Sequence, residues 1–74
     1  MTEPSGDARI ARLVHDVRTP LTVIAGFAEL LERGMPTLTN EQRSDYVARI
    51  AAAARELQEI LDAEREERLG GEHA

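Results

Sequence analysis

The chain has 74 residues, a formal net charge of −5 and no cysteine. This length allows one domain at most, because it is near the lower limit at which a chain buries a core of its own. The negative charge, with no lysine in the sequence, argues against a nucleic acid partner. The lack of cysteine excludes a disulfide framework and a thiolate metal site, and it makes a reducing, cytoplasmic compartment the simpler expectation.

The composition favours an all-α fold. Hydrophobic residues make up 42% of the chain but aromatic residues only 3%, so the interior must come from helix seams of Ala, Leu, Ile and Val. No apolar run approaches the roughly 18 residues of a membrane span, and we therefore expect no membrane contact by this segment.

The first helix is predicted to start at the breaker cluster of residues 4–7, where Ser5 or Asp7 supplies the N-cap, and to run to about Arg33. Gly34 is expected to end it in a left-handed conformation, and a proline two residues later prevents its resumption.

Apolar residues recur along this helix at spacings of four and three, which predicts one stripe facing a partner helix. The stripe comprises Ile10, Val14, Val17, Leu21, Ile24, Ala28 and Leu31, and further apolar residues lie beside it at Leu13, Phe27 and Leu30. His15 lies about 150° from the centre of the stripe, where solvent or a docking protein reaches the ring. Pro20 removes a backbone hydrogen bond and predicts a bend just after His15.

A second helix is predicted to begin at a T-x-x-Q capping box formed by Thr39 and Gln42. Its apolar positions are Tyr46, Ile50, Ala53, Leu57 and Ile60 or Leu61. Gly70 and Gly71 are expected to close it. The preceding segment, residues 64–68, mixes charges of both signs at helical spacing, which is typical of a solvated helix end rather than a binding site.

A connection of about five residues predicts an antiparallel helical hairpin. Since two helices cannot hide all of these apolar residues, we expect two copies to form a homodimeric four-helix bundle. The expected domain spans residues 7–69, with flexible ends at residues 1–6 and 70–74.

The most informative segment is residues 15–21, His-Asp-Val-Arg-Thr-Pro-Leu, which places an imidazole, a carboxylate and a hydroxyl within one helical turn. It resembles the H-box, commonly written H-[E/D]-x-R-T-P-L, of the dimerisation and histidine phosphotransfer (HisKA-type) domain of two-component sensor histidine kinases, and every defined position agrees. The resemblance covers about residues 7–69, although only the H-box is specific.

This resemblance implies that His15 accepts the γ-phosphoryl group of ATP from a separate catalytic domain and passes it to an aspartate on the receiver domain of a response regulator. Asp16 is able to accept a hydrogen bond from one ring N–H and to stabilise the charge that develops on the imidazole, and the family's acidic neighbour is assigned this base role. Thr19 lies on the same helical face, and by resemblance its hydroxyl positions a water for regulator dephosphorylation. Arg18 pairs with a nearby acid or steadies a phosphate, and neither role is preferred.

A glycine in the middle of a helix, such as Gly26, lowers helix stability by about 1 kcal/mol relative to alanine, so a compensating role in docking or in packing is expected. It shares a face with Thr22, and Ala52 extends this strip of small side chains from the second helix. The strip suits a docking surface for a response regulator, the alternative being that Gly26 only permits close helix packing.

The sequence contains no glycine-rich phosphate loop, so we expect no cofactor on this chain, with ATP and Mg on a separate kinase ATP-binding domain. The favoured interpretation is therefore the central domain of a larger sensor kinase. A stand-alone phosphorelay shuttle and a purely structural dimerisation module with an idle His15 are the alternatives.

Overall fold

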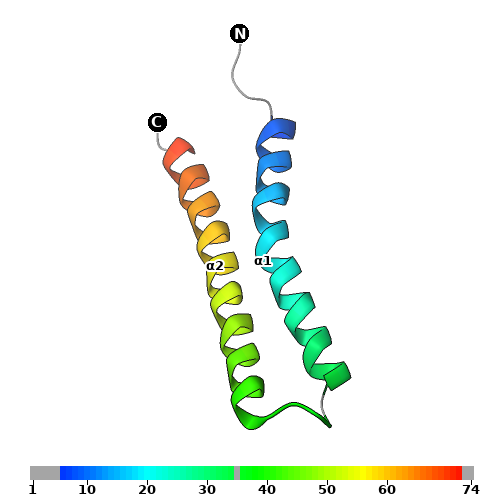
Figure 1. Cartoon of the computed structure of the whole chain (residues 1–74). Helices are drawn as coiled ribbons and strands as arrows, with labels where there is room; N and C mark the ends of the chain where they lie inside the picture. Colours follow the sequence, from blue (N-terminus) through cyan, green and yellow to red (C-terminus); the bar gives the residue numbers. More distant parts are fainter. Residues whose placement is uncertain (1–5, 35, 73–74) are drawn as a thin grey trace.

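The computed structural model describes residues 6–34 and 36–72, with side chains through Glu67. This part of the chain forms two helices, α1 (Gly6–Gly34) and α2 (Asn40–Glu72), and contains no strand. The helices run antiparallel, so that both chain ends lie at one end of the molecule and the connection lies at the other (Figure 1). The predicted all-α helical hairpin is confirmed.

The hairpin is a single layer. Its principal dimensions are 56 × 20 × 11 Å, and the smallest of these equals the diameter of one helix with its side chains. Among the described residues only Pro20 and Ala53 are classed as buried, so this chain by itself has almost no core.

The turn after α1 differs in detail from the prediction. The helix ends at Gly34, but no described glycine has a positive φ, so the expected left-handed conformation is wrong. Instead the carbonyl of Gly34 accepts hydrogen bonds from the backbone N–H groups of Thr37 and Leu38, each at 2.9 Å. The hydroxyl of Thr37 donates to the same oxygen at 3.2 Å. These donors cap the helix without a left-handed residue.

The predicted capping box at the start of α2 is confirmed. The N–H of Gln42 donates to the hydroxyl of Thr39, and the N–H of Thr39 donates to the side-chain oxygen of Gln42, both at 3.0 Å. The two hydrogen bonds satisfy backbone donors that a helix start otherwise leaves unpaired.

α1 begins within the range expected, whereas α2 extends further than expected. α1 begins at Gly6, which leaves Asp7 in its first turn, and the candidate cap Ser5 lies outside the described residues. α2 continues through Gly70 and Gly71 to Glu72, so these glycines do not close it. Glycine lowers helix stability but is free to adopt helical angles.

The two helices meet along a line centred on Pro20 of α1 and Ala53 of α2. Pro20 is less than 2% exposed, and Ala53 is 5% exposed. At the end near the connection, the rings of Phe27 and Tyr46 lie 5.3 Å apart, and the guanidinium of Arg49 lies 5.7 Å from the centre of the Phe27 ring. The half-buried apolar residues are Leu13, Val17, Val23, Ile24, Phe27, Leu31, Leu38, Tyr46, Ile50, Ala51, Ala54, Leu57 and Ile60.

The predicted apolar stripe on α1 is therefore only partly correct. Val17, Ile24 and Leu31 lie in the contact between the helices, whereas Ile10, Val14 and Leu21 are 60%, 48% and 49% exposed. Compared with the centre of the predicted stripe, the surface of α1 that contacts α2 is shifted around the helix toward Pro20. Leu13 and Phe27 extend the apolar surface on that side. The exposed members of the stripe lie on one flank of the hairpin. On α2 the contact uses Ile60, and Leu61 is 47% exposed.

α1 changes direction near the middle of its length, in the cyan part of the ribbon (Figure 1). Pro20 lies within this helix and is buried against α2. Because proline removes one backbone hydrogen bond and crowds the preceding turn, it accounts for the expected bend.

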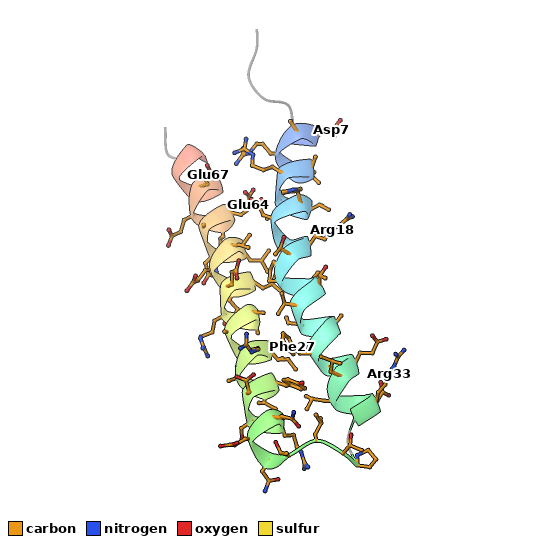
Figure 2. All side chains as sticks on the ribbon, viewed as in Figure 1. Asp7, Arg18, Phe27, Arg33, Glu64 and Glu67 are labelled. Carbon is orange, nitrogen blue, oxygen red and sulfur yellow. The ribbon has the colours of Figure 1, made fainter. Side chains whose placement is uncertain are left out.

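Ion pairs join the helices at the end where the chain termini lie. Arg9 of α1 lies 3.8 Å from Glu64 and 3.9 Å from Glu67 of α2. Figure 2 shows both glutamates on the part of α2 beside the first turns of α1. The side chain of Glu64 is only 25% exposed, so the prediction of a merely solvated helix end is wrong for this residue. Its carboxylate is drawn into the contact by Arg9.

Candidate functional site

His15 projects from the first half of α1 into solvent. Its side chain is 84% exposed, which confirms the predicted outward position of the imidazole. A ring displayed in this way is accessible to another protein.

The contact between His15 and Asp16 distinguishes the two ring nitrogens. Nδ1 of His15 lies 3.3 Å from Oδ1 of Asp16, whose side chain is 48% exposed. An ionised carboxylate only accepts hydrogen bonds, so in the neutral ring Nδ1 carries the proton and donates it. The lone pair is then on Nε2, the ring nitrogen directed away from the backbone. The separation is at the long end of the hydrogen-bond range, so Asp16 favours this tautomer while the ring keeps some freedom.

Thr19 and Arg18 complete the set of polar groups around the imidazole. Thr19 is exposed and lies one helical turn after His15 on the same face. Arg18 is also exposed, and Figure 2 shows its side chain directed away from α2. The imidazole, carboxylate and hydroxyl predicted from the sequence are thus brought together on one side of α1.

The small residues Thr22 and Gly26 continue this face toward the connection. Both are exposed, and a Cβ added to Gly26 would meet no other described side chain or neighbouring helix within 4 Å. Close packing within the hairpin therefore does not explain the glycine. A shallow hollow on the outer surface of α1 is lined by Thr22, Ala25, Gly26, Ala28, Glu29 and Glu32.

Ala52 lies on the same side of the hairpin although it belongs to α2. Pro20 and Ala53 are the buried residues at which the two helices face each other. Thr19 directly precedes Pro20 in α1, and Ala52 directly precedes Ala53 in α2. In an antiparallel pair, the same rotation of about 100° from the contact line carries both residues to one flank. The candidate docking residues therefore come from both helices.

A second hollow lies between the first half of α1 and the last turns of α2. Its lining residues are Arg9, Arg12, Leu13, Asp16, Ile60, Ala63, Glu64, Glu66 and Glu67. This hollow was not predicted from the sequence. Glu64 and Glu67 nevertheless continue the spacing of Ala53, Leu57 and Ile60, and this periodicity was the available signal that they face α1.

Within the described residues, no group of three or more His, Cys, Asp or Glu side chains is arranged to hold a metal ion. The described helices also include none that is long and apolar enough to cross a membrane.

A two-helix hairpin that displays an imidazole beside a carboxylate has the layout of a phosphoacceptor domain. Residues 8–66 match the family model of the His Kinase A (phospho-acceptor) domain, and the chain belongs to this family. The resemblance inferred from the H-box is thereby confirmed.

A curated relative points to the same kind of protein. Over 39 residues the chain is 51% identical to the nisin biosynthesis sensor protein NisK of Lactococcus lactis subsp. lactis. This segment covers 53% of the chain but only 8% of NisK. No solved structure gives a significant match.

Proposed function

We propose that His15 is the phosphoacceptor of this domain: it takes the γ-phosphoryl group of ATP held by a separate catalytic domain and passes it to an aspartate on a response-regulator receiver domain. The observation that carries the proposal is the exposed imidazole paired with Asp16 inside a segment that matches the phospho-acceptor family. ATP, and the Mg that accompanies it, belong to the separate domain.

The tautomer favoured by Asp16 defines the chemistry of both steps. Nε2 attacks the γ-phosphorus, a P–N bond forms, and the bond to the bridging oxygen breaks as ADP leaves. Asp16 accepts the hydrogen bond from Nδ1–H and offsets the positive charge that develops on the ring. In the second step the receiver carboxylate attacks phosphorus, the P–N bond breaks, and its electron pair returns to Nε2.

Thr19 has a separate role in this proposal. Its exposed hydroxyl, one turn from His15, holds a water molecule for hydrolysis of the acyl phosphate on the regulator. The strip of Thr22, Gly26 and Ala52 receives the regulator, since the absence of a Cβ at Gly26 allows another backbone to approach α1 closely.

The domain acts as a homodimer in a four-helix bundle, in a cytoplasmic part of its protein. The shortage of buried residues in one hairpin supports the dimer, because a second copy would cover the exposed apolar flank of α1. The absence of cysteine supports the compartment.

The test is transfer of phosphate to the chain. The chain is incubated with labelled ATP and the ATP-binding domain of a sensor kinase, and phosphohistidine is measured as label stable to base and labile to acid. We expect label on the wild-type chain and on His73→Gln, and none on His15→Gln. Equal label on His15→Gln would overturn the proposal.

The alternative functions give different results in the same assay. A purely structural dimerisation module takes no label from any donor. A stand-alone phosphorelay shuttle takes label from a phosphorylated receiver domain but not from ATP and the kinase domain.

A further inference from the structure

The charges around His15 differ from those of the chain as a whole. Residues 9–18 contain three arginines and one aspartate, a net charge of +2, in a chain whose formal net charge is −5. The following ten residues contain no charged side chain. The imidazole thus lies within a segment of net positive charge.

The three arginines of this segment have different partners. Arg9 lies within 4 Å of two carboxylates on α2, so its charge is balanced. The guanidinium groups of Arg12 and Arg18 are exposed, and neither has an ion pair or hydrogen bond with any of the side chains that the structure describes. These two cations are available to an anion that arrives from outside.

Their positions on α1 bracket the imidazole. Arg12 is three residues before His15 and Arg18 three residues after it, and side chains with this spacing on a helix are neighbours with Cβ atoms about 5–6 Å apart. They lie about 60° of rotation to opposite sides of the ring. Arg12 is on the side of the hollow between the helices, whereas Arg18 is directed away from α2 (Figure 2).

Most of the acidic side chains near Arg12 already contact another residue, and Glu66 is the exception. Asp16 contacts Nδ1 of His15, and both Glu64 and Glu67 contact Arg9. Glu66 also lines the hollow and makes no ion pair with a described side chain, but it belongs to the far helix. None of these carboxylates forms an ion pair with Arg12, so its guanidinium keeps its hydrogen-bond donors for an incoming anion.

We infer that Arg12 is a positioning residue that, together with Arg18, attracts and orients the anionic phosphoryl group at Nε2 of His15. This inference rests on the proposed function and adds to it a residue outside the H-box. The positive charge of each guanidinium attracts the anionic oxygens of a phosphoryl group, and this attraction depends on the charge rather than on the shape of the side chain. No bond to Arg12 forms or breaks.

The experiment uses a chemical donor, so that no kinase is needed. In a His73→Gln background His15 is the one imidazole of the chain. The anionic donor phosphoramidate is added at low ionic strength, and the rate of phosphohistidine formation is followed by 31P NMR. We expect Arg12→Gln to slow the rate about twofold, as expected when one charge is removed at roughly 7 Å in water. Arg12→Lys should keep the wild-type rate.

Arg65→Gln is the matched control, because Arg65 is also an exposed arginine without a partner among the described side chains, but lies on α2 away from His15. It should label at the wild-type rate. Added salt should slow the wild-type chain more than Arg12→Gln, since screening removes an attraction that the variant lacks. Circular dichroism confirms that all variants keep their helix content.

Two results would overturn the inference: an Arg12→Gln rate and salt dependence equal to wild type, or an Arg12→Lys rate as low as that of Arg12→Gln. Failure of the proposed function gives a different pattern. There the chain would not be labelled from ATP and a kinase domain, whereas the rates with phosphoramidate would still depend on Arg12.

Discussion

At the residue scale, the proposed reactivity of His15 depends on Asp16, a neighbour that the helix does not place in ideal geometry. Adjacent side chains on a helix diverge by about 100°, so Asp16 reaches the imidazole only through Nδ1, the ring nitrogen nearest the backbone, and at 3.3 Å. This geometry selects a tautomer and leaves Nε2 free. The exposed ring also keeps the freedom to turn toward the two partners that the proposed function requires.

Thr19 separates the two proposed reactions of the site. We expect Thr19→Ala to accept phosphate from ATP at close to the wild-type rate, because attack by the imidazole needs no hydroxyl. Dephosphorylation of a phosphorylated receiver domain should slow tenfold or more, since loss of a group that positions water or moves a proton typically has an effect of at least this size. Both rates are measured on the same preparation.

Thr19→Ser is the matched control, because it keeps the hydroxyl and should retain much of the dephosphorylation rate. If alanine reduces phosphate acceptance and dephosphorylation by the same factor, Thr19 supports the structure around His15 and has no specific role in hydrolysis.

At the scale of the elements, the sequence predicted the features that depend on local chemistry. The capping box of Thr39 and Gln42 forms as expected, because its hydrogen bonds involve residues three apart. The position of His15 off the apolar stripe likewise predicted an exposed imidazole, since one helix fixes the relative direction of its side chains.

The face that α1 turns to α2 was not fixed by local chemistry. Apolar residues cover nearly half of the circumference of α1, so periodicity allows a contact through Leu21 or through Leu13 and Phe27. The choice depends on α2, where Tyr46 meets Phe27. For the same reason Glu64 was misjudged: its burial depends on Arg9, 55 positions earlier in the sequence.

Gly26 allows a prediction in which stability and binding change in opposite directions. Gly26→Ala should raise the free energy of unfolding by up to about 1 kcal/mol, because alanine favours the helix and the added Cβ meets no atom outside its own helix within 4 Å. The same methyl group should weaken binding of a receiver domain, since it fills the place where another backbone approaches. Urea unfolding and isothermal titration calorimetry measure the two effects.

Ser44→Ala provides the control for Gly26→Ala, because Ser44 is an exposed residue of α2 where alanine also favours the helix. It should raise stability without changing receiver binding. Unchanged or tighter binding of the receiver to Gly26→Ala would exclude the strip of small residues as the docking surface.

At the scale of the whole molecule, the two flanks of the hairpin have different characters. Ile10, Val14 and Leu21 of α1 lie on the flank opposite Thr19, and the same direction of rotation places Val47 and Leu61 of α2 there as well. These residues are between 47% and 60% exposed in the single chain. A second copy that covers this flank leaves His15 and Ala52 accessible.

The dimer is therefore expected to be sensitive to a charge on one flank and not on the other. Leu21→Glu should weaken dimerisation at least about tenfold, because Leu21 is already half-buried, burial of its exposed half contributes roughly 0.75–1.5 kcal/mol, and two copies are affected. Leu30→Glu is the control, because Leu30 is 48% exposed and Leu21 is 49% exposed. Leu30 lies on the flank of Thr19, so this substitution should leave the dimer intact. Sedimentation equilibrium measures both. A wild-type monomer at tens of micromolar, or equal weakening by both variants, would rule out this flank as the dimer interface.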